Sequence, residues 1–448
     1  MEFLAMIFDN ILISLEKIFI RYNKILPLKK FIEHFFVNRD LFGRISLVWD
    51  EHTIQHFNDD ERELLDALCK EIEQTLGKHS YSASGMIITR DYPFTEEKQR
   101  AVVFTYGNNF PFTVMDRLPS ESYWSRRSEN TTKPDDEISK KMTVFYSIKG
   151  GVGRSTALAA AAWYFASQGK KVMVLDMDLE SPGLSSSLLP EDRQPEYGLL
   201  DWLVEDVVRN GDEVVGNLSA SSPLANGSGI RGEIIVIPAH GKSMTEYVTK
   251  MGRAWMPRMG EESRLAWPQR LRELIKKLDS IHKPDCIFID ARAGLDEISS
   301  ACVLDLAPHT VLLFAQEGTQ TWTGYSILFH YWNAVGQARD IRETLKIVAA
   351  MIPPLEDKRS YVQGLRENAW KSFSTHLYDE LPADQQASFS YDLMDEQAPH
   401  TPWLIHWYQG LMAMQRLDTL DSALDPNLMT ATFPFVCSLY DYIFGEDS

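Results

Sequence analysis

The sequence predicts an α/β protein whose main domain is a mostly parallel sheet covered by helices on both faces. From Met142 onward, short apolar strands alternate with helical stretches, which is the rhythm of such a sheet. A glycine-rich segment at 149–156 lies between one of these strands and a helix. The strand and helix patterns on either side predict a small α+β domain before this region and a helical region after it.

Composition limits the class of protein. The chain has 448 residues, which suggests two or three domains. Its formal net charge is −18, so any contact with nucleic acid would need a local basic patch. Four scattered cysteines without a CxxC pair argue against a zinc ribbon or a disulfide framework. We expect a cytoplasmic protein. The sequence contains no run of about 18 uncharged apolar residues, so no membrane-spanning helix is predicted.

Five segments are predicted along the chain. They are an amphipathic helix at 1–30, a small α+β domain of unknown role at 31–125, a linker at 126–141, the main domain at 142–354 and a helical region at 355–448. The last segment is interpreted as an all-helical cap or a third lobe.

The segment 1–30 has apolar residues at helical spacing as far as Phe19, and Pro27 ends or kinks the helix. Its charges from Lys17 onward are all basic. Such a helix docks on a neighbouring domain or subunit, or lies peripherally on an anionic membrane. Asp9 and Glu16 weaken attraction to lipid, which favours docking.

Strand-like and helical patterns can be placed within the two predicted domains. In the small domain, strands are predicted at 44–50, 86–92, 100–106 and 110–116, with a helix at 59–76. In the main domain, strands are predicted at 143–148, 171–178, 233–239, 286–290, 310–316 and 346–352. His52 and His56 are four residues apart, but the glutamate of an HExxH motif is absent and a metal there is not favoured.

The segment KGGVGRST has the features of a phosphate-binding loop. Gly150, Gly151 and Gly153 permit a tight turn whose N–H groups approach phosphate oxygens. The N-terminus of the following helix favours an anion. Ser155 is the hydroxyl expected to reach Mg²⁺, and Thr156 is expected to bond the α-phosphate.

Two acidic strand ends accompany the loop. LDMD ends one strand with Asp176 and Asp178, and CIFID runs into Asp290. Asp290 has the form of a carboxylate that holds Mg²⁺ through water, and the N–H of Gly294, four residues later, can contact a γ-phosphate. Asp176 is alternatively a strand-end carboxylate that caps the next turn.

KGGVGRST, LDMD and IDARAG resemble the deviant Walker A loop, the second acidic strand and the Walker B and switch II segment of the ParA/MinD group of P-loop ATPases, within the SIMIBI class. The resemblance covers about 142–354 and extends to KIVAAMIPP, which is similar to the strand and turn around adenine. Arg154 at the last basic position resembles a KGGVGR variant subgroup, some of whose members lie in bacterial defence operons.

The resemblance implies ATP and Mg²⁺ as cofactors and a homodimer that sandwiches two ATP molecules. Lys149 would reach the partner subunit's phosphates, Arg154 would contact the β- and γ-phosphates in its own subunit, and Asp178 would position or activate the attacking water. Metal binding would fall to Ser155, Asp176 and Asp290. The nucleotide-binding set would be Gly150, Gly151, Val152, Gly153, Arg154, Ser155, Thr156, Gly294, Ile352 and Pro353.

Two residues depart from the family pattern. Arg292 replaces a proline and is either a second cation near the γ-phosphate or, preferably, a solvent-facing side chain. Arg154 has a planar fork that is wider than an ammonium, so it is expected to permit ATP binding while slowing hydrolysis.

The segment 250–277 carries eight basic and three acidic side chains, interleaved with Trp255 and Trp267. It is either a contact for DNA, RNA or an acidic partner, or, preferably, an exposed helix face with i, i+4 ion pairs. Three functions follow. They are an ATPase switch of a defence system with protein partners encoded nearby, an ATPase that positions cargo on DNA or membrane, and a catalytically weak module that ATP stabilises.

Overall fold

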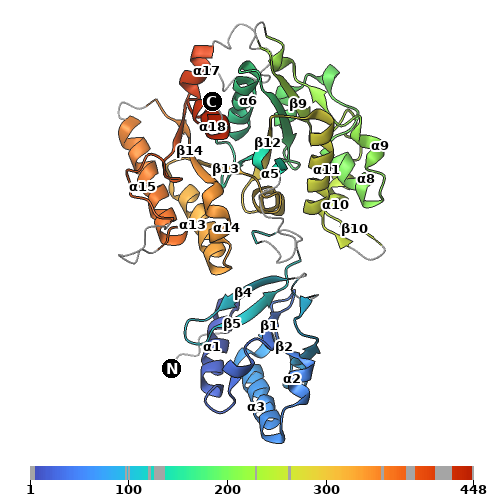
Figure 1. The fold of residues 1–448 in the computed structure, drawn as a ribbon, viewed down its shortest axis with the longest axis vertical. Helices are drawn as coiled ribbons and strands as arrows, with labels where there is room; N and C mark the ends of the chain where they lie inside the picture. The colour runs from blue at the N-terminus through green and yellow to red at the C-terminus, as the bar shows by residue number, and fades with distance from the viewer. Residues whose placement is uncertain are drawn as a thin grey trace. The chain divides into compact units, whose positions relative to one another are not determined.

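The computed structural model describes residues 6–95, 98, 101–119, 123–125, 137–227, 230–260, 264–354, 358–379, 389–408 and 426–445. The chain divides into two compact units, formed mainly by residues 1–120 and by residues 132–448 (Figure 1). Most of the predicted linker lies outside the described residues, and its last part forms the short helix α5 (Glu137–Lys141).

The first unit is built on a mixed five-stranded sheet of order β3-β2-β1-β5-β4. Within it, β1 pairs antiparallel with β2 and parallel with β5. Three of its helices are α1 (Ile11–Tyr22), α2 (Glu51–Gln55) and α3 (Asp59–Leu76). Its strands are β1 (Phe35–Arg39), β2 (Ile45–Asp50), β3 (Ile87–Arg90), β4 (Val102–Tyr106) and β5 (Phe112–Asp116).

Helix α1 packs into the core of this first unit. Its apolar face is buried together with α3 and the sheet, and the Phe19 ring contacts those of Phe35 and Phe112. The Glu16 carboxylate accepts a hydrogen bond of 2.8 Å from the backbone of Asn109. From Ile11 to Phe19, the apolar face that the sequence left open to a domain or a membrane is therefore covered by the unit's own residues, whereas Ile7 and Phe8 before it are about half exposed.

The second unit contains an eight-stranded sheet of order β15-β14-β13-β6-β12-β7-β9-β8. All neighbouring pairs are parallel except β8 with β9, which confirms the predicted fold class. The strands are β6 (Met142–Ser147), β7 (Lys171–Asp176), β8 (Ala220–Ser221), β9 (Glu233–Ile237), β12 (Cys286–Ala293), β13 (Thr310–Ala315), β14 (Leu345–Ile352) and β15 (Trp403–His406). A separate hairpin joins β10 (Arg258–Met259) to β11 (Arg264–Leu265).

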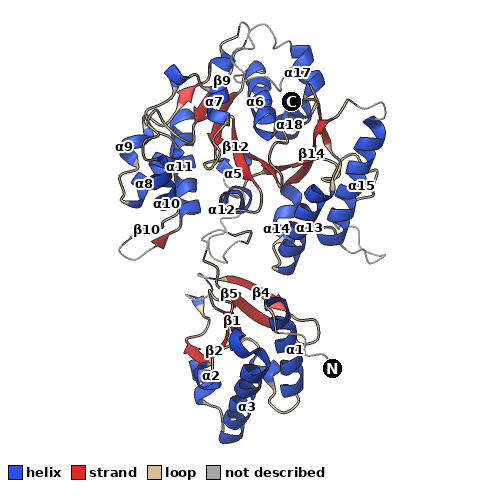
Figure 2. Ribbon diagram, turned by 180° about the vertical axis from the view of Figure 1, so that it is seen from behind, coloured by secondary structure: helices blue, strands red, loops and turns tan. Residues whose placement is uncertain are grey.

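Helices cover both faces of this sheet (Figure 2). Side chains alternate across each strand, so that Val144 and Tyr146 of β6 enter one core while Phe145 enters the other. The helices are α6 (Arg154–Ser167), α7 (Leu184–Leu188), α8 (Leu199–Val207), α9 (Asp212–Val215), α10 (Tyr247–Ala254), α11 (Trp267–His282), α12 (Glu297–Ser300), α13 (Thr319–Ala334), α14 (Ala338–Ile341), α15 (Lys358–His376), α17 (Pro426–Thr432) and α18 (Phe435–Phe444).

The C-terminal region is mostly helical where it is described, as predicted, but it also contributes to the sheet. Strand β15 pairs with β14 at the sheet edge, which the sequence analysis did not predict. Helix α18 packs against α6 in the same core, through contacts such as Phe165 with Tyr440. The sheet therefore extends beyond the predicted boundary at residue 354.

A search of the described helices for one long and apolar enough to cross a membrane found none.

Candidate functional site

The three motif-bearing strands lie next to one another in the sheet, in the order β6-β12-β7. The register places Asp290 of β12 opposite Asp176 of β7 and opposite Phe145 of β6. Because parallel strands share a carboxyl edge, the glycine-rich loop after β6 and the acidic residues after β7 and β12 meet there. The sheet topology thus brings the Asp290 segment to two motifs that lie more than a hundred residues earlier in the chain.

The glycine-rich loop adopts the backbone that its glycines permit. Gly151 and Gly153 have φ values of +73° and +78°, a region that other residues rarely enter. A Cβ on Gly153 would also lie 3.1 Å from the sulfur of Met351, at the end of β14. Helix α6 starts at Arg154, and its N-cap, Gly153, has no side chain to cap the first turn. That turn is suited to bind an anion through its N–H groups.

Arg154 does not extend over the loop in this structure but lies among the carboxylates. Its side chain is buried, with 7% exposure. Its Nε donates to Oδ1 of Asp290 at 2.6 Å, and its Nη2 donates to Oδ2 of Asp178 at 3.2 Å. Ser147, the last residue of β6, accepts from Nη1 at 3.4 Å. Burial acts to lower the pKa of Arg154, but Asp290 and Asp178 more than offset it, and the net shift is upward.

Ser155 and Asp290 form the second contact of the site. The Ser155 hydroxyl donates to Oδ2 of Asp290 at 2.6 Å, so both oxygens of this carboxylate are hydrogen-bonded. Hydroxyl and carboxylate oxygens are the ligands that Mg²⁺ prefers. Oδ1 of Asp178 is buried and has no hydrogen-bond partner among the described residues. This donor set fits the predicted magnesium ion, with Ser155 and Asp290 as the residues that would hold it.

Asp176 is fully buried behind these residues. Its Oδ2 accepts from the backbone N and the hydroxyl of Ser185, at 3.0 and 2.6 Å, at the start of α7. This is the turn-capping arrangement weighed as the alternative for Asp176. Burial, with repulsion from Asp290 and Asp178, raises its pKa to about 7. Burial also raises the pKa of Asp178, although Arg154 opposes that shift.

The Asp176 carboxyl should make the stability of the unliganded protein fall as pH rises from about 4 to about 7. Its pKa is about 7 in the folded state, against an ordinary value of 3.8. Between these values the folded state holds a proton that the unfolded state has lost, so raising the pH favours unfolding. The full effect is on the order of 4 kcal/mol.

Urea unfolding from about pH 5 to about pH 8 measures this dependence. Asp176→Asn cannot titrate, so its free energy of unfolding should vary less across the window than that of the wild type. Identical pH profiles for the two proteins would contradict the assignment.

The remaining predicted nucleotide-binding residues lie around the loop in different states. Lys149 is exposed and has no hydrogen-bond or ion-pair partner in the described part of the chain, whereas Val152 is buried beneath the loop. Thr156 is half-buried in the first turn of α6, with Gly150 and Gly151 exposed before it. The N–H of Gly294 donates to the carbonyl of Ser147 at 3.0 Å, so contact with a phosphate requires that bond to exchange.

Ile352 and Pro353, predicted beside adenine, follow Met351 at the end of β14. Ile352 is buried and its carbonyl accepts from the backbone of Trp407. Pro353 is half-buried. Met351 lies close to Gly153, so this strand end approaches the loop.

Arg292 is partly exposed and paired with a carboxylate in this structure. It forms an ion pair of 2.6 Å with Glu180, in the loop after β7, and its side chain is 31% exposed. Glu180, Ser185 and Ser147 are parts of the site that sequence reasoning missed. None belongs to a spaced motif, and only the position of Ser147 at a strand end preceding the loop marks it.

The basic segment 250–277 is largely engaged within its own unit. Arg270 is completely buried and pairs with Asp206 at 2.7 Å, while Arg258 bridges Asp206 and Glu273. Internal partners are also found for Lys250, Arg272 and Lys277. The preferred interpretation, an exposed helix face with i, i+4 pairs, is therefore wrong in its details: the pairs are long-range, and Arg270 and Arg272 are buried.

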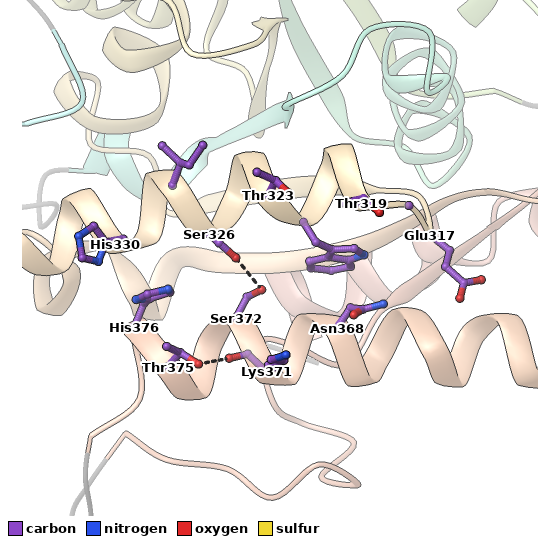
Figure 3. A pocket seen from close by; sticks show the side chains of 13 residues that line it. Glu317, Thr319, Thr323, Ser326, His330, Asn368, Lys371, Ser372, Thr375 and His376 are labelled. Atoms are coloured by element: carbon purple, nitrogen blue, oxygen red, sulfur yellow. Dashed lines mark hydrogen bonds between the residues drawn. The ribbon is translucent and has the colours of Figure 1, made fainter.

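A groove of about 830 Å³ lies elsewhere on the same unit, between α13 and α15 (Figure 3). Its walls are rich in hydroxyl groups, and Ser326 and Ser372 approach each other across it at 3.4 Å. It shares no residue with the loop site.

At His52 and His56 the rings lie 4.2 Å apart, and the described residues contain no group of three or more His, Cys, Asp or Glu suited to hold a metal.

The fold and the site define the protein as a P-loop NTPase. The defining features are a strand, a glycine-rich loop and a helix N-terminus, together with a carboxylate on the neighbouring strand that is bonded to the loop serine. The comparisons refine this class. The matching family model is described as ParA, NUBPL iron-transfer P-loop NTPase, and it covers residues 137–203. The loop region is therefore similar to P-loop NTPases of the ParA type.

Individual proteins match over limited regions or at low identity. The cytosolic Fe-S cluster assembly factor CFD1 of Yarrowia lipolytica is 39% identical over 64 residues, which is 14% of this chain and 22% of that protein. The ParA family ATPase of Chlorobium tepidum TLS has 15% identity and a TM-score of 0.43, covering 66% of this chain and 99% of that one. The septum site-determining protein MinD of Pyrococcus horikoshii OT3, complexed with Mg-ADP, has 22% identity and a TM-score of 0.33, with 48% and 71% covered.

Proposed function

We propose that this protein is an ATP-binding and ATP-hydrolysing molecular switch that closes as a homodimer around its nucleotides. The observation that carries the proposal is the Asp290 carboxylate, which contacts both Arg154 and Ser155 of the phosphate-binding loop. Loop, helix N-terminus, metal-binding hydroxyl and strand-end carboxylate are thereby assembled in one place.

Each side chain has a defined task in this proposal. Ser155 and Asp290 hold Mg²⁺, which when bound supplies positive charge to the phosphate oxygens. Asp178 orients the attacking water and accepts its proton, and its unpartnered Oδ1 is suited to that role. Asp176 supports the metal-binding carboxylates from behind. Lys149, exposed at the front of the loop, crosses to the partner subunit's phosphates.

The deviant Walker A assignment rests on the pairing of Lys149 with Arg154 in the motif KGGVGRST. A role in bacterial antiviral defence, with partners encoded nearby, rests on the resemblance to the KGGVGR subgroup alone. The arginine at the usual lysine position is the feature of this chain that supports that role.

Cluster transfer, which the name of the Yarrowia lipolytica protein suggests for that protein, is not favoured by the cysteines. Cys69, Cys286 and Cys302 are buried. Burial raises the pKa of Cys69 to about 12 and raises the pKa of the other two thiols as well, so they are poor sources of thiolate. Positioning on membrane or DNA is likewise disfavoured, because α1 is docked and most of the basic segment is paired.

Light scattering tests the switch directly. The nucleotide-free protein should have the mass of a monomer, and ATP with Mg²⁺ should double it. The Asp178→Ala variant, in which hydrolysis is slowed, should keep the doubled mass longer than the wild type. An unchanged mass in both proteins would contradict the dimer switch, while ATP binding measured in the same samples would show whether the loop assignment survives.

A further inference from the structure

We infer that Arg154 is an internal cation that occupies the metal-binding carboxylates until a bound nucleotide displaces it. Nucleotide binding would therefore precede metal binding. This inference rests on the proposed function and adds an order of events to it. It is drawn from the position of Arg154 within the acidic group rather than over the loop.

Nearly all the oxygens of the three carboxylates already accept hydrogen bonds. Asp290 is bonded through Oδ1 to Arg154 and through Oδ2 to Ser155. Asp178 is bonded through Oδ2 to Arg154. Asp176 accepts at both oxygens, from the backbone of Asp178 at 3.3 Å and from Ser185. Oδ1 of Asp178 is the single carboxylate oxygen of these three residues without a donor in the described structure.

Arg154 and a divalent cation therefore compete for the same oxygens. Mg²⁺ demands close contact with oxygen ligands in a near-octahedral arrangement, which oxygens already bonded to a guanidinium cannot supply. Two positive charges among the same buried carboxylates also repel each other strongly. As long as Arg154 donates to Asp290 and Asp178, the metal-binding residues are engaged.

A nucleotide provides the means to release Arg154. Arg154 is the first residue of α6, directly after the glycine-rich turn, so a phosphate held by the loop lies near the origin of its side chain. Guanidinium groups form strong bidentate hydrogen bonds with phosphate oxygens. A bound phosphate group thus offers Arg154 a second anionic partner, and its departure frees Asp290.

The planar guanidinium explains why arginine occupies the two carboxylates more effectively than a lysine would. Two different nitrogens of one guanidinium bond two different carboxylates, at 2.6 Å to Asp290 and 3.2 Å to Asp178. Lysine carries a compact point charge on a flexible chain and lacks this fixed fork. Arg154→Lys should therefore keep the positive charge while weakening the closure.

Binding of Mn²⁺ to the nucleotide-free, full-length protein tests the inference. Electron paramagnetic resonance counts free Mn²⁺ as it is titrated against the wild type, Arg154→Lys and Arg154→Ala. Removing the arginine should raise Mn²⁺ affinity about tenfold or more, the scale of one charge-assisted hydrogen bond, and Arg154→Lys should lie between the other two proteins.

Arg193→Ala is the matched control, because Arg193 is an exposed arginine in the short turn Glu191–Arg193 and does not contact the acidic group. It should bind Mn²⁺ as weakly as the wild type. Equal Mn²⁺ affinity in the wild type and in both Arg154 variants would overturn the inference. Circular dichroism confirms that each variant is folded, and Arg154→Lys keeps the test decisive if Arg154→Ala does not fold.

A parallel titration separates this inference from the proposed function. A fluorescent ADP analogue is added to the wild type in EDTA, where the closed state should still accept nucleotide. Absence of nucleotide binding with or without Mg²⁺ would overturn the proposed function, while the Mn²⁺ comparison would still decide the role of Arg154. Nucleotide binding that requires metal to be present first would overturn the proposed order.

Discussion

Replacing Asp178 with asparagine is expected to lower the rate of phosphate release from ATP by about 10²- to 10⁴-fold, the range typical of a lost general base. Asp178 makes one side-chain contact to a cation, to Arg154 at 3.2 Å, and its Oδ1 is buried without a partner among the described residues. An oxygen in that state is available to orient a water molecule. Asparagine preserves the shape of the side chain but cannot accept the proton.

The measurement is phosphate release at saturating ATP, together with ATP binding by the same protein. Asp192→Asn is the matched control, since Asp192 is an exposed residue in a short turn (Glu191–Arg193) and should leave the rate unchanged. If Asp178→Asn bound ATP normally and released phosphate at the wild-type rate, Asp178 would not be the base. If neither protein released phosphate above background, the chain would be an ATP-binding module without turnover.

Much of the fold was predictable because its signals are local. The helix predicted at 59–76 matches α3 exactly, because the Asn58 and Glu61 capping box and the apolar spacing both lie in the sequence. The strands that carry the loop and the acidic residues were recognisable as short apolar runs. Their order β6-β12-β7 was not predicted, because sequential strands are more often neighbours, and here β12 lies between β6 and β7.

Elements whose pattern depends on distant partners were missed. Strand β1 reads FFVNR and is buried throughout, including Asn38 and Arg39. Those polar residues are tolerated because Asn38 bonds Ser46 and Arg39 pairs with Asp116, partners that the sequence does not identify. Strand β15 has only four residues and joins the sheet through β14. A run so short carries too little periodicity to separate strand from helix.

The site also combines features with a local sequence signal and features that depend on distant partners. The sequence identified which side chains belong to the loop and to the acidic strand ends, because their types and spacing carry the chemistry. It did not identify where Arg154 points, since a long flexible side chain chooses between a phosphate and a carboxylate according to what is present. The ion pair of Arg292 with Glu180 was likewise not predictable, because it joins the end of β12 to the loop after β7, which meet only in the folded sheet.

Arg270→Met is expected to destabilise the second unit by about 3–5 kcal/mol, the usual cost of breaking a buried ion pair from one side. Arg270 is completely buried, and its Nε donates to Asp206 at 2.7 Å. Its other nitrogens donate to the backbone carbonyls of Leu203, Ala254 and Met256. Methionine fills part of the volume but leaves these acceptors without a donor, so desolvation of each is no longer compensated.

Urea unfolding followed by tryptophan fluorescence and circular dichroism measures this loss. Arg253→Met is the matched control, because Arg253 lies in the same basic segment but is exposed and bonds only the carbonyl of Thr249. It should change the free energy of unfolding by less than about 0.5 kcal/mol. Comparable small effects at both positions would mean that the buried network contributes little. A large effect at Arg270 alone would establish that the buried pairs of Arg270 stabilise the fold.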